Sequence, residues 1–316
     1  MEKNTKKGLI TGFIGVIFVG LQPIIAILRP IAIDAYLSGA MTCLVEMMIF
    51  FPIMLIELKL INSNSQKINN EGNQVKKFDF LKGLKKNFWL LIFIGLLFGL
   101  NQILFFMGYD LAGAINGSLT QKTTVFFSLF LGYFLLKERI TKLQVAFSIL
   151  LFLGLAISIT QFFTLINISL NILIGVGIIL AISLMWIFGH TLTKSIFGRE
   201  EITPIQMVFI RNMISGGILI ITYLLFFAPD IRVFIEPGNL IFFFLMGSVY
   251  GAGLVCWYKT LSYLDVSKAT IVFAPTPISS AIFATFMLGE QFTIAHLVGT
   301  IIIVISIIII VNQKKE

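Results

Sequence analysis

Three ionisable side chains lie inside long apolar stretches of this sequence: Glu46, Lys122 and Arg211. A charged group in the middle of a lipid bilayer costs about 2.5–3.5 kcal/mol to insert, so such residues are candidates for function by default. Glu46 lies ten residues after Tyr36, and Lys122 lies nine residues after Gly113, where two apolar segments begin. At a helical rise of about 1.5 Å per residue they are about 15 and 14 Å deep, near the midplane of a roughly 30 Å hydrocarbon core.

Opposite charges at matching depth have two interpretations. In the first, Lys122 attracts an anionic group of a substrate, such as a carboxylate, while Glu46 balances that charge or carries a coupling proton. In the second, the two side chains form a structural ion pair that holds their helices together. Both interpretations predict that Glu46 and Lys122 are electrostatically coupled.

Arg211 is predicted to lie nearer a membrane surface than Glu46 and Lys122. It follows Pro204 by seven residues, which places it about 10 Å from the inner face. A long basic side chain at that depth can reach the interface. Snorkelling or helix packing is therefore favoured over a substrate contact.

Polar side chains cluster before and after Lys122: Asn101, Gln102, Asn116, Thr120, Gln121, Thr123 and Thr124. In lipid such groups need partners, so they either bond between helices or face a wet cavity. Gln121 is adjacent to Lys122 and is predicted to point to a different helix face. The aromatic residues Trp186, Tyr250 and Trp257 are candidates for pocket walls, with plain packing as the alternative.

Pro275 and Pro277 lie near the middle of another apolar segment. Proline removes a backbone donor and bends a helix, so Pro277 is predicted to free carbonyls for a substrate site or to shape packing. The predicted substrate-binding residues are Lys122, Glu46, Asn101, Gln102, Thr120, Tyr250, Trp186 and Pro277. No catalytic residue, metal site or cofactor is predicted.

The composition of the chain indicates what kind of secondary structure carries these side chains. The 316 residues are 58% hydrophobic and 12% charged, with a mean hydropathy of +0.99, whereas a soluble globular protein carries about 25% charged residues. Most of the surface must therefore face lipid, and the predicted fold is an all-α integral membrane protein. Ten apolar segments are long enough to cross a bilayer: 8–28, 36–56, 88–108, 113–135, 143–161, 171–193, 204–227, 239–259, 267–288 and 294–311.

The distribution of Lys and Arg predicts the orientation. With the N-terminus in the cytoplasm, only Arg29 and Arg232 lie in outer loops. This predicts both termini on the cytoplasmic side of a bacterial or archaeal plasma membrane. The polar stretch 57–87 is predicted to be a solvated cytoplasmic loop. The net charge of +8 is assigned to membrane-flanking loops, and no nucleic-acid partner is predicted.

One stretch of the chain occurs twice. The pattern from Gly95 to Glu138 recurs from Gly247 to Glu290, 152 residues later. The ten segments therefore divide into two predicted halves, residues 8–161 and 171–311. Because each half has five segments, the second half enters the membrane inverted relative to the first. Inverted repeats are a transporter architecture, since exchanging the conformations of the two halves turns an inward-open cavity into an outward-open one.

Three features together resemble the drug/metabolite transporter superfamily, in its EamA-like ten-helix branch. They are the duplication, the pattern from Trp186 to Lys194, and the run Pro277-x12-Glu290. The resemblance covers nearly the whole chain. It implies a secondary transporter, often an exporter, of small metabolites such as amino acids. The predicted partners are a small-molecule substrate, for which an anionic group such as a carboxylate is expected, the lipid bilayer, and a coupling proton or ion.

The first half departs from the family pattern. Val125 stands where the proline is expected, while Glu138 is retained. Arg211 fits an arginine that the family often has early in the second helix of each half, whereas Thr42 stands at the first-half counterpart. Glu138 and Glu290 lie at segment ends, where a structural role in positioning helix ends is predicted.

Two other functions remain as alternatives to a transporter. An intramembrane enzyme acting on lipid would need a catalytic constellation, and no predicted span carries paired aspartates or a His-Glu-x-x-His motif. A passive channel is the second alternative. The sequence has no Gly-x4-Gly-Lys-Ser/Thr loop, so ATP is not the predicted energy source. A transporter rather than an enzyme is therefore predicted.

Overall fold

The computed structural model describes residues 2–70, 80–136, 140–163, 169–199, 201–227, 230–264 and 266–312. These residues form helices joined by turns and short connections, and they contain no strand. Within them, nine stretches are long and apolar enough to cross a membrane. The prediction of an all-α membrane protein is confirmed. Glu138 and the segment 164–168 lie outside the described residues.

The long helices are α1 (Glu2–Ile27), α2 (Ala35–Asn70), α4 (Phe88–Ala112), α7 (Lys142–Thr160), α8 (Leu170–Gly198), α9 (Pro204–Phe226), α11 (Pro237–Tyr263) and α14 (Ile294–Asn312). Two further segments are interrupted. The predicted span 113–135 consists of α5 (Ala114–Thr120), the 3₁₀ turn η1 (Gln121–Thr123) and α6 (Thr124–Leu136). The predicted span 267–288 consists of α12 (Val266–Val272) and α13 (Thr276–Leu288). Short helices α3 (Phe80–Lys86) and α10 (Arg232–Ile235) precede α4 and α11.

The prediction of a loop over residues 57–87 is wrong for most of its length. Helix α2 continues to Asn70, and α3 follows from Phe80. The sequence after Glu57 contains Leu, Lys, Ile and Gln but neither Gly nor Pro before Glu71. The absence of both helix breakers allows the helix to continue where the chain leaves the apolar layer, although six of the thirteen residues 58–70 are Asn or Ser, which favour helix only weakly. Residues 71–79 lie outside the described part.

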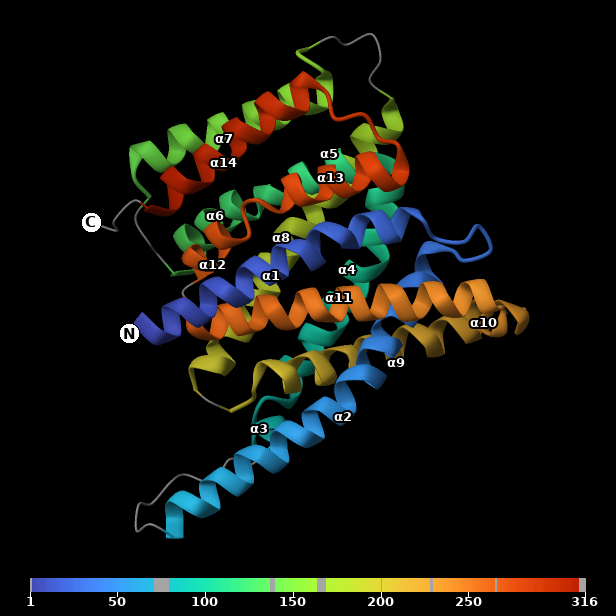
Figure 1. Cartoon of the computed structure of the whole chain (residues 1–316), viewed down its shortest axis with the longest axis vertical. Helices are drawn as coiled ribbons and strands as arrows, with labels where there is room; N and C mark the ends of the chain where they lie inside the picture. The colour runs from blue at the N-terminus through green and yellow to red at the C-terminus, as the bar shows by residue number, and fades with distance from the viewer. Residues whose placement is uncertain are drawn as a thin grey trace.

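Helices from distant parts of the chain lie side by side. Helix α1 packs against α11, α2 against α9, α4 against α8, and α7 against α14 (Figure 1). Further contacts join α4 to α9, α2 to α11, α1 to α13, and α8 to α6. The two predicted halves have equivalent neighbours. If α1 is exchanged with α8, α2 with α9, α4 with α11, α6 with α13 and α7 with α14, the same pairs of packed helices result.

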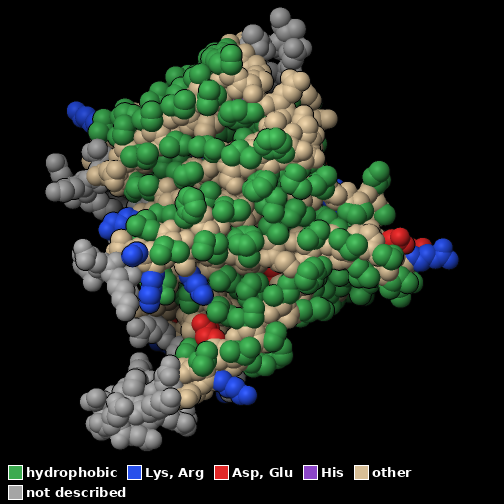
Figure 2. All heavy atoms as spheres, viewed as in Figure 1, with side chains coloured by type: hydrophobic (Ala, Val, Ile, Leu, Met, Phe, Trp, Pro, Cys, Tyr) green, Lys and Arg blue, Asp and Glu red, His purple; other side chains and the backbone are tan. Residues whose placement is uncertain are grey.

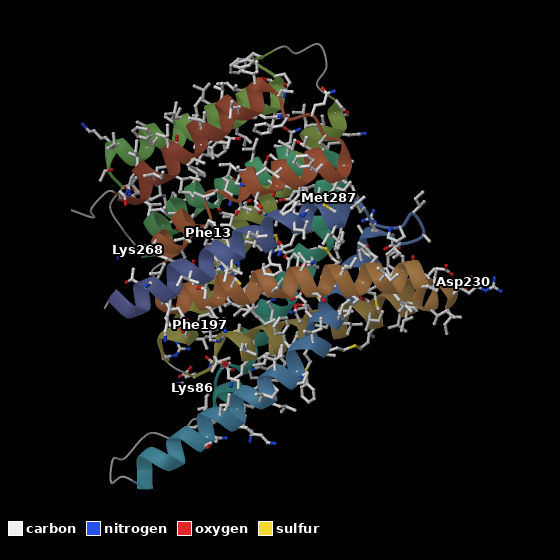
Figure 3. The ribbon with its side chains drawn as sticks, in the orientation of Figure 1. Phe13, Lys86, Phe197, Asp230, Lys268 and Met287 are labelled. Atoms are coloured by element: carbon white, nitrogen blue, oxygen red, sulfur yellow. The ribbon has the colours of Figure 1, made fainter. Side chains whose placement is uncertain are left out.

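The surface shows which faces meet lipid. Hydrophobic side chains cover most of the visible face in Figure 2, and large ones such as Phe286 and Phe226 are 84% and 79% exposed. Lys86 and Lys268 lie on the side where α1 begins, whereas Asp230 lies on the opposite side (Figure 3). Below, these two sides are called the N-terminal face and the opposite face. The apolar layer between them is the part that lipid surrounds.

Candidate functional site

A cavity of about 100 Å³ lies between the helices of the two predicted halves. Its walls come from α1, η1, α6, α8, α9, α11 and α12, and from Phe273 between α12 and α13. The polar side chains that line it include Gln22, Gln121, Lys122, His190 and Arg211. The aromatic ones are Trp186, Tyr250, Trp257 and Phe273. Such a mixture of apolar walls and a few polar groups is typical of small-molecule sites.

Two helix interruptions meet at this cavity. In the first half, the 3₁₀ turn Gln121–Thr123 separates α5 from α6. In the second half, the helical pattern stops after Val272 and resumes at Thr276. The two interruptions are 152 residues apart, which is the offset of the sequence repeat. Broken helices leave backbone groups without intrahelical partners, and polar side chains or ligands can then bind them.

Lys122 satisfies one of these backbone groups. Its Nζ donates a hydrogen bond of 2.7 Å to the main-chain carbonyl of Phe273. The Thr276 hydroxyl donates to the same carbonyl, also at 2.7 Å. Lys122 is only 7% exposed and lines the cavity. A lysine ammonium has three donors, so this single bond to the described residues leaves capacity for an anionic ligand.

Arg211 also faces the cavity; of the two alternatives favoured for it, snorkelling to the surface does not occur, whereas helix packing does bury it. It is 3% exposed, because α9 packs against α2, α4 and α11. Its guanidinium lies 4.4 Å from the ring centroid of Phe98, a cation–π contact. Its Nη2 donates to Asn212 Oδ1 at 3.5 Å. Nε has no hydrogen-bond partner among the residues that the structure describes.

Glu46 does not pair with Lys122 as predicted. Its Oε2 accepts a hydrogen bond of 2.6 Å from Asn212 Nδ2. The basic residue that acts on it electrostatically is Arg211. Across the described ranges, no ion pair joins Glu46 to Lys122. Matched depth did not imply a shared face: the Glu46 side chain packs against Gly251 of α11, whereas Lys122 turns toward the break in the opposite half.

Glu46 is fully buried, and its second carboxylate oxygen remains without a hydrogen-bond donor in the described part of the chain. It does not line the cavity itself. Glu46 therefore lies behind Arg211, as a counter-charge one layer removed from the site.

Trp257, a candidate pocket wall, and His190, which was not predicted as a site residue, also line the cavity. The His190 ring lies 5.1 Å from Phe98 and 5.4 Å from Trp257, measured between centroids. Two of their buried nitrogens, His190 Nδ1 and Trp257 Nε1, lack a partner among the described residues. His190 follows Trp186 by four residues, and this spacing puts both on one helix face. This four-residue spacing was the feature of the sequence that could have identified His190 as a lining residue.

The other predicted site residues divide into two groups. Trp186 and Tyr250 line the cavity, as predicted. Asn101, Gln102, Thr120 and Pro277 do not belong to its lining, although Asn101 and Gln102 are almost fully buried. Thr120 donates to the Asn116 carbonyl in its own helix at 2.7 Å.

The break in the second half lies directly before Pro277, which has no N–H to bond the carbonyl of Phe273 four residues earlier, the carbonyl that Lys122 binds. Phe273, Ala274 and Pro275 form the turn, and Pro277 lies in the first turn of α13, where a missing N–H costs no intrahelical bond. Gln121 lines the cavity beside Lys122, contrary to prediction. The 3₁₀ turn interrupts the α-helical periodicity on which that prediction depended.

Glu290 has the structural role predicted for it. Its two carboxylate oxygens accept hydrogen bonds from the backbone N–H groups of Ala114 and Ile115, at 2.8 and 3.0 Å. A carboxylate from the second half thereby caps the N-terminus of α5, where the helix dipole favours negative charge. The cap positions the broken segment that carries Lys122.

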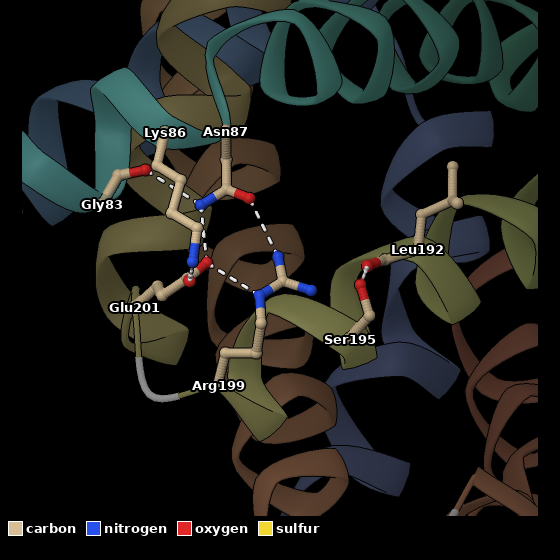
Figure 4. Close-up of polar contacts among 7 residues, drawn as sticks. All are labelled: Gly83, Lys86, Asn87, Leu192, Ser195, Arg199 and Glu201. Atoms are coloured by element: carbon tan, nitrogen blue, oxygen red, sulfur yellow. Dashed lines mark hydrogen bonds and ion pairs between the residues drawn. The ribbon is translucent and has the colours of Figure 1, made fainter.

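A polar network closes the N-terminal face (Figure 4). Glu201 accepts from Lys86, from Asn87 Nδ2 at 2.9 Å and from Arg199 Nε at 2.9 Å. The hydrogen bonds of Lys86 and Asn87, followed by Arg199, lower the pKa of the Glu201 carboxyl to about 2. The network links α3 to the connection between α8 and α9.

Each face also has a contact between helices of one half. On the opposite face, Arg29 at the end of α1 forms an ion pair of 2.6 Å with Asp110 of α4. On the N-terminal face, Lys194 of α8 donates to the carbonyls of Leu261 and Leu264 at the end of α11.

Comparison with known proteins gives relatives over most of the chain. An uncharacterized transporter of Bacillus subtilis, YyaM, is 25% identical over 231 residues, covering 71% of this chain and 73% of its own. An uncharacterized transporter of Methanothermobacter thermautotrophicus is 22% identical over 317 residues, covering 98% and 87%. A solved crystal structure superposes with a TM-score of 0.66 at 13% identity, covering 96% of both chains, which shows a shared fold.

The family comparison covers both predicted halves. The model of the EamA-like transporter family matches residues 6–160 and, separately, residues 173–312. Together with the membrane-spanning helices and the buried cavity, this match identifies a multi-pass membrane protein. The chain belongs to the EamA-like transporter family.

Proposed function

We propose that this transporter is a secondary carrier for small metabolites that bear a carboxylate, the class that includes amino acids. One observation carries the proposal: Lys122 and Arg211, one from each predicted half, line the same buried cavity. A carboxylate bound there would accept charge-assisted hydrogen bonds from both side chains. It would also offset the cost of burying two basic side chains.

The arrangement of the helices supports alternating access around this site. The set of helix neighbours survives exchange of the halves, and both broken segments meet at the cavity. We propose that residues 8–161 and 171–311 are inverted repeats. The Arg29–Asp110 ion pair would break when the opposite face opens, and the contacts of Lys194 with α11 would break when the N-terminal face opens.

The coupling and the orientation are part of the same proposal. A proton or ion gradient supplies the energy, and Glu46 balances the charge of Arg211 from outside the cavity. Both termini lie in the cytoplasm of the plasma membrane, as the distribution of Lys and Arg favours. Export is the direction that the family resemblance implies.

A metabolite screen in everted membrane vesicles tests the proposal. Vesicles with the wild-type protein should accumulate at least one carboxylate-bearing metabolite, and Lys122→Gln vesicles should not. Lys142→Gln is the matched control, because Lys142 is exposed at the start of α7 and does not line the cavity. Accumulation that is equal in all three preparations would refute the assigned site. Equilibration without accumulation, insensitive to a protonophore, would favour a passive channel.

A further inference from the structure

The charges at the cavity are unequal. Lys122 and Arg211 line it, and both are more than nine-tenths buried. In the lining formed by described residues there is neither Asp nor Glu. Glu46 acts on Arg211 electrostatically but lies behind it, where its Oε2 is bound to Asn212. Two of these three residues are basic, and the single acidic one lies outside the lining.

The polar groups that are available to a ligand are mainly donors. Arg211 Nε and Trp257 Nε1 are buried N–H groups without partners among the described residues, and His190 Nδ1, also without a partner there, donates or accepts according to its tautomer. Lys122 donates one hydrogen bond within the described part of the chain, to Phe273. The acceptors in the lining are neutral, such as the side-chain amides of Gln22 and Gln121. An unpaired buried donor is costly, so a ligand that only accepts hydrogen bonds gains most from this site.

A carboxylate and an amino acid differ in what they bring to such a cavity. A monocarboxylate carries one negative charge and neutralises the excess. An amino acid carries the same carboxylate together with an ammonium group, which adds a cation to a buried site that already has two. Like charges placed together in a water-poor site oppose binding. The remaining walls are largely aromatic or aliphatic, including Trp186, Tyr250 and Leu254, and suit an apolar body.

We infer that the cavity selects small, largely apolar carboxylic acids over the amino acids that share their carbon skeleton. This inference rests on the proposed function and narrows its substrate class. Arg211 and Lys122 bind the carboxylate, and the aromatic walls enclose the body of the molecule. Discrimination arises because the lining offers an α-ammonium group only neutral acceptors.

Phenylalanine and two analogues that each lack one of its charged groups test the inference with the purified full-length protein in detergent. Hydrocinnamate is phenylalanine without its amino group, and phenethylamine is phenylalanine without its carboxylate. We expect hydrocinnamate to bind at least about tenfold more tightly than phenylalanine, the factor expected from one like-charge contact in a buried site. Phenethylamine should bind more weakly still. Affinities are measured by isothermal titration calorimetry.

Adding an acid to the lining should reverse the preference. Gln121→Glu changes one amide to a carboxylate without changing its size and gives the ammonium group a partner. The ratio of the two affinities should fall by about tenfold or more in favour of phenylalanine. Gln22→Glu, on α1, is a second variant that makes the same change from another wall of the cavity, should the first not fold.

The possible results distinguish a failure of this inference from a failure of the proposed function. Equal or tighter binding of phenylalanine by the wild type would overturn the inference, while the carboxylate site would stand. Tightest binding by phenethylamine would overturn both. Binding of none of the three probes, or an unchanged ratio in a folded acidic variant, would also overturn the inference. Loss of hydrocinnamate binding in Lys122→Gln, but not in Lys142→Gln, would support both.

Discussion

The ammonium of Lys122 donates a hydrogen bond of 2.7 Å to the main-chain carbonyl of Phe273. The two residues belong to the two interrupted segments, one in each predicted half, and each lies at its interruption. The bond therefore joins the halves at the centre of the molecule, inside the cavity. A substrate carboxylate competes with the Phe273 carbonyl for the same ammonium, so binding at this site can loosen the contact between the halves.

The charge environment of Glu46 gives the first prediction. Because Glu46 is coupled to Arg211 and not to Lys122, the variants Glu46→Gln and Arg211→Gln should be non-additive in stability. We expect an interaction energy of roughly 1 kcal/mol or more for this pair. Glu46→Gln and Lys122→Gln should be additive within about 0.5 kcal/mol. Unfolding of the single and double variants in detergent measures both cycles, and the reverse ranking would contradict the structure.

The cap formed by Glu290 gives a second prediction. In Glu290→Gln, one oxygen that accepts from the backbone of α5 becomes an amide nitrogen, and the negative charge at the helix N-terminus is lost. The variant should lose about 1–2 kcal/mol of stability. The matched control is Glu236→Gln, because Glu236 precedes α11 as its N-cap, is exposed and makes no side-chain cap bond. Equal thermal unfolding of the two variants would argue against the cap.

The network around Glu201 predicts a dependence on pH. Its pKa falls from an ordinary 4.5 to about 2 because Lys86 and Asn87, then Arg199, donate to the carboxylate. A group whose pKa is lower in the folded state stabilises the fold above its unfolded pKa, and that contribution is lost as the pH falls. Thermal stability attributable to Glu201 should therefore decline between pH 4.5 and about 2.

The effect should be modest and sensitive to salt. The side chains of Lys86 and Arg199 are 60% and 43% exposed, so solvent screens both pairs. In Glu201→Gln the decline over this pH range should be smaller than in the wild type. A variant that keeps the full decline would show that other carboxyl groups cause it.

Orientation in the membrane is the fourth prediction. On a background without Cys43 and Cys256, the two free cysteines of the described chain, single cysteines are introduced as Lys268→Cys and Asp230→Cys. The two positions are exposed and lie on opposite faces. An impermeant thiol reagent added to intact cells should label only the cysteine at position 230. Labelling only at position 268 would mean that the N-terminal face is outside.

Much of the fold could be predicted because lipid imposes a simple rule on sequence. A membrane span needs a long apolar run, so nine of the predicted segments correspond to helices long and apolar enough to cross. The predicted span 113–135 is also helical but interrupted. The extension of α2 to Asn70 was missed because polar composition was interpreted as a loop, although neither Gly nor Pro interrupts the chain before Glu71.

The site was harder to predict because depth and helix face are independent. Sequence spacing placed Glu46 and Lys122 at one depth, but which neighbour each side chain meets depends on how the helices rotate and cross. For Arg211, its distance from a helix end favoured snorkelling or helix packing over a substrate contact, and could not show that it lines the cavity. Its burial comes from the packing of α9 among α2, α4 and α11, which the sequence of α9 does not encode by itself.

Transport by the purified protein in proteoliposomes tests the central claim most directly. With a carboxylate found in the vesicle screen, wild-type protein and Lys142→Gln should show saturable uptake, whereas Lys122→Gln and Arg211→Gln should each lose at least about tenfold in rate at low substrate concentration. The wild type and the three variants must all be purified as folded proteins before their rates are compared. Saturable uptake that is unchanged in both cavity variants, or that is confined to solutes without a carboxylate, would contradict a substrate site built from Lys122 and Arg211.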